Sequence, residues 1–299
     1  MTVAFVLSGG ASLGAVQVGM LRALIERDVR PDLIVGTSVG AVNGAFIASN
    51  GPTSQTVDDL AALWIGMRRG RVFPLEPLTG LLGFLGARRN LVPGTALRRL
   101  IARNVAHDRL EELPVPLHVV ACDVLSGAEV LLSRGPLADA VLASAAIPGI
   151  LPAVDWEGRL LIDGGVVDNT PLSHAVALGA TEVYVLPTGG PCELTAAPRG
   201  ALAMVLHATG LMVAQRFAAE AASFAGRADV VVLPPPCPIR VHPMDFGHAD
   251  ALIRRAEADA RTFLDGRRAR PSVVRRRVPG DRPDGRVLED GDDGLGVAA

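Results

Sequence analysis

The sequence predicts an α/β protein with a mostly parallel central sheet and helices on both faces. Short apolar runs alternate along the chain with stretches of helical periodicity, which is typical of this class. The runs occupy residues 3–7, 33–35, 115–123, 128–132, 159–162, 182–187 and 229–233. They are continuously apolar, as expected for strands whose two faces are both buried. Glycine-rich turns follow several of them, so functional groups are expected at strand ends.

Length and composition favour one large domain followed by a tail. The 299 residues are 49% hydrophobic, which is enough to bury a substantial core. We expect this domain to span residues 1–265. Residues 266–299 contain two arginine clusters and then a segment rich in Pro, Gly and Asp, so they are predicted to be disordered.

The first element is a buried strand that runs into a loop of small residues. Val3–Leu7 is followed by Ser8-Gly9-Gly10-Ala11-Ser12-Leu13-Gly14 and then by a helical pattern. Backbone amides at Gly9, Gly10, Ala11 and Ser12 could hold either a phosphate or an oxyanion at this helix start. The loop lacks the Gly-Lys-Ser/Thr ending of a P-loop, and Ala11 interrupts a G-x-G-x-x-G pattern. Nucleotide or phosphoanion binding by the Gly9–Gly14 loop is therefore disfavoured but stays open.

The second strand leads into a G-x-S-x-G sequence. Residues 32–35 form a short apolar run, Gly36-Thr37-Ser38-Val39-Gly40 follows, and residues 41–48 favour a helix. On such a strand–turn–helix the serine hydroxyl is exposed at the sheet edge, and the flanking Gly36 and Gly40 permit close packing. Ser38 is the candidate nucleophile, the alternative being an ordinary Gly-Ser turn.

A third glycine motif supplies a carboxylate. Asp163-Gly164-Gly165 follows the apolar run 160–162. Alone it would suggest an Asp-Gly turn. Together with Ser38 and the free amides of the first loop, Asp163 completes the three roles that acyl transfer requires: nucleophile, base and oxyanion donor.

With these motifs the chain resembles the patatin-like phospholipase family. Further family-like segments follow in family order, at residues 19–24, 121–127, 143–149 and 169–171, so the resemblance spans about residues 3–187. It implies a serine hydrolase of lipid carboxylic esters that needs no metal or cofactor. Ser38 would be the nucleophile, Asp163 the base, and the amides of Gly9, Gly10, Ala11 and Ser12 the oxyanion hole, supported by Gly14, Gly36, Gly40, Gly164 and Gly165.

The chain departs from the family pattern at two positions. Ala11 stands where many members have glycine, which is tolerable if its φ is negative. Leu13 stands where many have arginine, which weakens any charge-assisted recognition of a phosphate head group. A catalytically silent lipid-binding relative is therefore a further alternative.

A serine–aspartate dyad is expected in place of a triad. The elbow begins at residue 36, too early for the strand order of an α/β-hydrolase. His174 lies in an expected helix over 171–178 and His118 in an apolar strand, so both are predicted to be structural. An aspartate base with an ordinary pKa near 4 would be weak at neutral pH, so Asp163 should be partly desolvated. Asp123 is predicted to cap a turn, and Asn43 to brace the elbow through buried hydrogen bonds.

Composition and charge bear on the binding partners and on the location of the protein. The net charge is −2, so nucleic-acid binding has no global electrostatic support. Cys122, Cys192 and Cys237 do not make a disulfide framework and suit a reducing compartment, and no group of residues has metal-ligand spacing. The N-terminus lacks a signal-peptide pattern, and no apolar stretch is long enough to span a membrane. A cytoplasmic location is the expectation, and the oligomeric state is not indicated.

Two segments are candidates for peripheral contact with a membrane. Residues 72–86, rich in Leu, Phe, Gly and Pro between flanking arginines, would suit an interfacial lid or an ordinary core-packed connection. The helix expected over 200–225 carries Met204, Leu211, Met212 and Phe217. Such residues on a helix usually belong to the core, and this is the prediction here.

Overall fold

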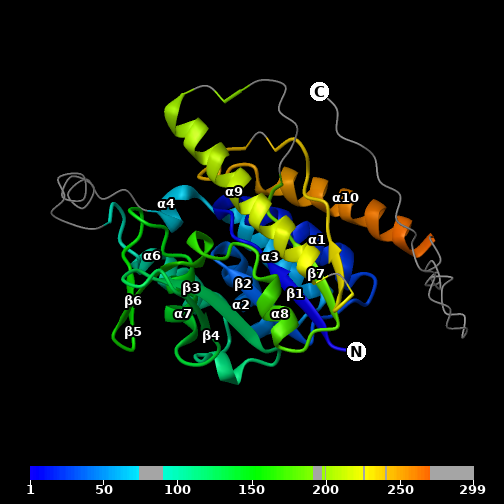
Figure 1. Cartoon of the computed structure of the whole chain (residues 1–299), viewed down its shortest axis with the longest axis horizontal. Coiled ribbons are helices and arrows are strands. Elements are labelled where there is room, and N and C mark those ends of the chain that lie inside the picture. The colour runs from blue at the N-terminus through cyan, green and yellow to red at the C-terminus, as the bar shows by residue number, and fades with distance from the viewer. Residues whose placement is uncertain (74–89, 191–196, 199, 225, 240, 270–299) are drawn as a thin grey trace, which may run out of the picture.

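A mixed eight-stranded sheet forms the centre of the molecule in the computed structural model, which describes residues 1–73, 90–190, 197–198, 200–224, 226–239 and 241–269 (Figure 1). The strand order is β5-β6-β3-β2-β1-β7-β8, and β4 also pairs with β3. The strands are β1 (Val3–Leu7), β2 (Leu33–Thr37), β3 (Leu117–Asp123), β4 (Glu129–Leu132), β5 (Val154–Trp156), β6 (Arg159–Asp163), β7 (Glu182–Leu186) and β8 (Asp229–Val232).

The central strands are parallel, as predicted. β3, β2, β1, β7 and β8 pair in parallel, whereas β4 and β6 run antiparallel to β3, and β5 runs antiparallel to β6. Every predicted apolar run contains a strand. β5 was not predicted, because its three residues contain no apolar run.

Helices cover both faces of the sheet, which confirms the predicted class. They are α1 (Ala15–Ile25), α2 (Val39–Asn50), α3 (Ser54–Gly66), α4 (Arg69–Val72), α6 (Thr95–Asn104), α7 (Leu137–Ser144), α8 (Leu172–Ala177), α9 (Ala201–Ser223) and α10 (Ala249–Ala269). The described residues also form short 3₁₀ turns, which are η1 (Ala11–Gly14), η2 (Leu110–Glu112) and η3 (Gly164–Val166).

Two cores follow from the alternation of side chains along each strand. Phe5 and Leu7 of β1 face a large core that contains residues of α1, α2, α3, α6, α7 and α10. Ala4 and Val6 face a smaller core with α8, to which Phe217 of α9 also packs. Because both faces of β1 are covered, its sequence is apolar at every position.

The sheet register brings the first two motifs together. β1 and β2 are parallel neighbours, with Leu7 opposite Gly36. Carboxyl ends of parallel strands open on the same edge of a sheet, so the loop after β1 and the turn after β2 lie side by side.

Helix α9 differs from its prediction. Met204, Leu211 and Met212 are 45%, 41% and 73% exposed, so assigning them to the core is wrong. The amino-terminal end of α9 extends beyond the sheet and the neighbouring helices (Figure 1). Phe217, further along, is partly buried against the smaller core.

The remaining sequence predictions can be compared with the structure only at the residues that it describes. Val72 and Phe73 are buried, whereas the rest of the 72–86 segment lies outside the described residues. α10 continues to Ala269, past the domain boundary expected at 265, and residues 270–299 lie outside the described part of the chain. Cys122 is a free thiol and Cys237 is disulfide-bonded, which the reducing compartment expected from the cysteine content did not indicate. None of the described helices is both long and apolar enough to cross a membrane.

Candidate active site

Ser38 occupies a strained turn between β2 and α2. Its φ of 55° and ψ of −123° lie in a region that a non-glycine residue rarely adopts. The turn is tight because α2 begins against β1. A Cβ on Gly40 would lie 2.1 Å from the carbonyl oxygen of Leu7, and one on Gly36 would lie 2.8 Å from the backbone of Ala41. These two glycines therefore permit the close packing that presents Ser38 at the sheet edge.

The backbone of the turn is held by neighbouring hydroxyls. The Ser38 amide donates to Ser144 Oγ at 2.8 Å, and Ser144 Oγ donates to the Val120 carbonyl at 2.6 Å. Thr37 Oγ1 donates to the Asp168 carbonyl at 2.9 Å. Sequence reasoning assigned no role to Ser144. Its only signal was its place in the family-like segment 143–149.

Asp163 ends β6 and lies beside Ser38. Ser38 Oγ donates to Asp163 Oδ2 at 2.6 Å, and the Gly165 amide donates to Oδ1 at 2.8 Å. Both Ser38 and Asp163 are only 6% exposed. A Cβ on Gly164 would lie 2.2 Å from the Val120 carbonyl, so glycine is needed where this turn crosses β3. Gly165 supplies its amide to the carboxylate.

Burial changes the acidity of Asp163. Desolvation raises the pKa of this carboxyl to about 6, although hydrogen bonds from Ser38 and Gly165 act in the opposite direction. A carboxylate with this pKa is a stronger base than a solvated aspartate and is still ionised at pH 7.

No histidine completes a triad within the described residues. The Asp163 carboxylate accepts hydrogen bonds there from Ser38 and Gly165 alone. His174 is instead hydrogen bonded to Glu129, and His118 Nδ1 lies 2.7 Å from Ser133 Oγ. The geometry is that of a serine–aspartate pair.

The two further polar residues singled out in the sequence have the expected structural roles. Asp123 Oδ1 accepts hydrogen bonds from the amides of Leu125 and Ser126, which caps the turn after β3. Asn43 is fully buried. Its amide donates to the Gly14 carbonyl and to Gln17 Oε1, and its oxygen accepts from Trp64 Nε1, so it ties α2 to the start of α1 and to α3.

The glycine loop offers fewer free amides than the sequence indicated. The Gly9 amide donates to the Asn169 carbonyl at 3.1 Å, and the Ser12 amide donates to the Pro243 carbonyl at 2.9 Å. Both of these predicted oxyanion donors, Gly9 and Ser12, are thereby engaged by backbone carbonyls in the structure. The amides of Gly10 and Ala11 have no acceptor among the described residues.

The loop backbone lies against both the elbow and β7. A Cβ on Gly9 would lie 3.2 Å from Ser38 Cβ, and one on Gly10 would lie 2.1 Å from Thr188 Oγ1. Gly14 packs on Val39 and Trp64. Ala11 has a φ of 51°, so the negative φ under which an alanine would be tolerated at this position is not adopted. An alanine in this left-handed region is strained, because its Cβ crowds the backbone.

An apolar pocket opens beside Ser38. It is lined mainly by Ala11, Val39, Val42, Trp64, Met67, Val72, Phe73, Leu97, Leu100, Ala145, Ile147 and Phe246. Phe246 also borders a surface groove with Arg68, Arg69 and His242. Arg68 and Arg69 therefore place positive charge near the pocket, although Asp245 lines the same groove and Leu13 supplies no charge.

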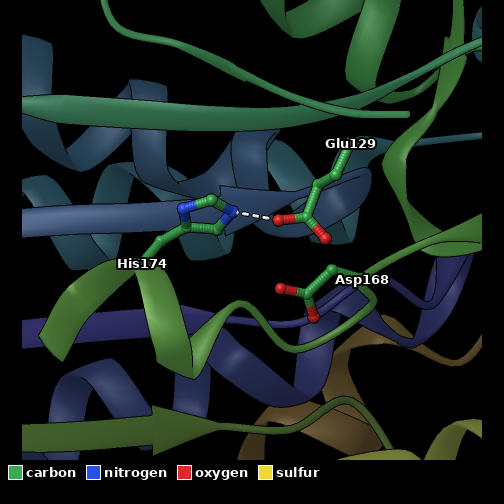
Figure 2. A group of neighbouring side chains, drawn as sticks. All are labelled: Glu129, Asp168 and His174. Carbon is green, nitrogen blue, oxygen red and sulfur yellow. Dashed lines mark hydrogen bonds and ion pairs between the residues drawn. The ribbon is translucent and has the colours of Figure 1, made fainter. Parts of the chain in front are cut away.

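One group of side chains in the described part of the chain could hold a metal ion. Glu129, Asp168 and His174 place their ligand atoms within 4.8 Å of one another (Figure 2). The sequence showed no metal-ligand spacing because these residues come from three separate elements.

Known proteins with similar sequences or structures were compared with the chain. An uncharacterised NTE family protein of Mycobacterium tuberculosis is 34% identical over 189 residues, which cover 63% of this chain and 49% of that protein. Patatin-like phospholipase domain-containing protein 6 of Homo sapiens is 32% identical over 194 residues, 64% of this chain and 14% of that protein. The chain thus spans about half the length of the mycobacterial relative and a small part of the human one.

Among solved structures, VipD from Legionella pneumophila aligns with 89% of this chain and 67% of its own, at 16% identity and a TM-score of 0.44. The family model for the patatin-like phospholipases matches residues 5–176, more than half of the chain. The chain therefore belongs to the patatin-like phospholipase family.

Proposed function

We propose that the protein is a lipid acyl hydrolase that uses Ser38 and Asp163 as a catalytic dyad. The observation that carries the proposal is the hydrogen bond from Ser38 Oγ to a desolvated Asp163 carboxylate at the mouth of an apolar pocket. Family membership supports a lipid ester as the substrate class.

In the first step Asp163 Oδ2 accepts the proton of Ser38 Oγ as the oxygen attacks the acyl carbon. The developing oxyanion would be stabilised by the amides of Gly10 and Ala11, each such donor being worth about 3 kcal/mol. The proton then passes from Asp163 to the leaving alkoxide, which departs as an alcohol. A water molecule attacks the acyl-enzyme, Asp163 takes its proton, and the fatty acid leaves as Ser38 regains that proton.

The surroundings of the dyad support an acyl chain in the pocket and a phosphate at its rim. The pocket walls are almost wholly apolar, so a hydrocarbon chain would be desolvated favourably there. Arg68 and Arg69 line the adjoining groove together with Asp245, and their guanidinium groups would be the cationic partners of a phosphate group there. We therefore propose phospholipids as the substrate.

Contact with a membrane would be peripheral in this proposal. The exposed Met204, Leu211 and Met212 of α9 are apolar side chains that could enter a lipid surface. A cytoplasmic location remains part of the proposal.

The test is labelling with a fluorophosphonate, followed by turnover of a short soluble ester. Wild type and the matched Ser54→Ala variant, whose serine is exposed at the start of α3, should be labelled once per chain and should hydrolyse the ester. Ser38→Ala should do neither. Labelling at Ser38 without turnover would favour a catalytically silent lipid-binding relative, and stabilisation by nucleotide without labelling would favour the phosphoanion-binding alternative.

A further inference from the structure

Three side chains outside the dyad converge on the sheet face that α8 covers. Glu129 begins β4, Asp168 follows η3, and His174 lies in α8 (Figure 2). His174 Nε2 is hydrogen bonded to Glu129 Oε1, and the Asp168 carboxylate points toward this pair. The ligand atoms of all three lie within 4.8 Å of one another.

Asp168 carries a buried atom with no partner. The residue is only 2% exposed, and its Oδ1 accepts one hydrogen bond, from the Thr170 amide at 3.2 Å. Its Oδ2 is fully buried and has no hydrogen-bond donor among the described residues. A buried carboxylate oxygen is normally paired, and this one lies beside two other side chains that can ligate a metal ion.

The charged side chains around Asp168 also favour a cation at this position. Glu220 of α9 lies close enough to act on Asp168 electrostatically, and Arg216 approaches Glu129 Oε2 at 3.4 Å. Three carboxylates therefore face one guanidinium and one imidazole.

We propose that Glu129, Asp168 and His174 form a binding site for one divalent transition-metal cation, with Zn²⁺ as the preferred ion. Imidazole nitrogen and carboxylate oxygen are both zinc ligands, and with three protein ligands a water molecule would fill the fourth position. Imidazole disfavours Mg²⁺ and Ca²⁺, which take oxygen ligands. The His174 Nε2–Glu129 contact would give way to two metal–ligand bonds, so any proton on Nε2 moves to Nδ1 or is released.

The cation would stabilise the segment that connects the two catalytic loops. The Asp168 carbonyl accepts from Thr37 Oγ1, one residue before the nucleophile, and the Asn169 carbonyl accepts from the Gly9 amide. Joining β4, Asp168 and α8 through one ion would hold this segment in place. The ion itself takes no part in the chemistry of hydrolysis, so the inference does not depend on the proposed activity.

The test uses the full chain, freed of metal with a chelator and dialysed. Calorimetric titration with ZnCl₂ should give one ion per chain, and a hundredfold excess over the Kd should raise the Tm by about 5 °C or more. CoCl₂ should produce the visible absorption of a four- or five-coordinate site. Asp168→Asn, His174→Gln and Glu129→Gln should each weaken Zn²⁺ binding by at least about tenfold.

Two controls separate this site from other sources of binding. His248 forms an exposed pair with Asp245 elsewhere on the surface, so His248→Gln is a matched variant that should bind Zn²⁺ like wild type. Ser38→Ala should also bind normally, whatever the outcome for hydrolysis. The proposal is overturned if wild type binds no stoichiometric Zn²⁺ and gives no Co²⁺ spectrum. It is equally overturned if folded His174→Gln and Glu129→Gln both retain wild-type affinity.

Discussion

Ser38 Oγ donates a hydrogen bond of 2.6 Å to Asp163 Oδ2, although 125 residues separate the two in the chain. The contact forms because β2 and β6 both pair with β3, β2 in parallel and β6 antiparallel. The carboxyl end of β6 is therefore set against the middle of β3, with Asp163 opposite Ala121. This relationship underlies the first predictions.

Removing the base should abolish most of the activity. Asp163→Asn keeps the shape of the side chain but cannot accept the serine proton, so kcat on a soluble ester should fall by about 10²–10⁴-fold. Because residues that act as a unit are non-additive, the double variant with Ser38→Ala should be hardly slower than Ser38→Ala alone. His174→Ala should keep most of the activity. Near wild-type turnover by a normally folded Asp163→Asn variant would contradict the dyad.

Activity should depend on the ionisation of Asp163. The proposed base, Asp163, would work only when deprotonated, and burial raises its pKa to about 6. Accordingly, kcat/KM for an uncharged soluble ester should rise about tenfold per pH unit below 6 and level off above it. A pH–rate profile measured between pH 4.5 and 8.5 checks this. A profile that is already flat at pH 5 would show that Asp163 is not desolvated during catalysis.

The free energy of unfolding should fall as the pH rises, whereas the activity should rise. The pKa of Asp163 is about 6 in the folded state, above the value of about 3.9 expected in an unfolded chain. Its contribution is therefore fully present below about pH 4 and is lost as the pH rises through 6, a change of about 2–3 kcal/mol. Urea unfolding should show a smaller decrease over this range in Asp163→Asn than in wild type. If the free energies of unfolding of the two proteins changed equally with pH, Asp163 would not be the source of the decrease.

Ala11 should be a site where glycine increases stability. Its φ of 51° costs an alanine about 1–2 kcal/mol, whereas the extra freedom of an unfolded glycine costs about 0.4–1 kcal/mol. Ala11→Gly should therefore raise the free energy of unfolding by about 0.5–1 kcal/mol. Ala15→Gly is the matched control, because Ala15 has a helical φ of −56°, and it should lower stability by about 1 kcal/mol or more. A loss of stability in Ala11→Gly would mean that the left-handed conformation is not adopted.

The apolar pocket should set the acyl-chain preference. Val42 lines it, so Val42→Phe would fill part of the space that a long chain needs. We expect kcat/KM for long-chain esters to fall by about tenfold or more, while a short-chain ester is little affected, since a few lost methylenes are each worth about 0.8 kcal/mol. Val124→Phe, on an exposed turn, is the control and should change neither. Equal losses of kcat/KM on both esters would mean that the substitution disturbs folding and not acyl-chain binding.

The sequence by itself determined the class of the sheet and indicated Ser38 and Asp163 as the residues of the proposed dyad. Strand runs buried on both faces are apolar throughout, and an elbow or an Asp-Gly-Gly turn is a local pattern that depends on torsions and close approach. These features depend on residues that are adjacent in the sequence. For the same reason Ser38 and Asp163 could be chosen before any contact between them was known.

Only the tertiary structure decided which groups are free, buried or charged. The amides of Gly9 and Ser12 are engaged by carbonyls of Asn169 and Pro243, far away in the chain, so no local pattern revealed their loss. The exposure of Met212 on α9 depends on what the rest of the fold leaves uncovered. Glu129, Asp168 and His174 meet because β4, η3 and α8 lie against one face. The burial of a group and the electrostatic field at that group depend on all of its neighbours in space. Those neighbours cannot be read from the order of residues in the sequence.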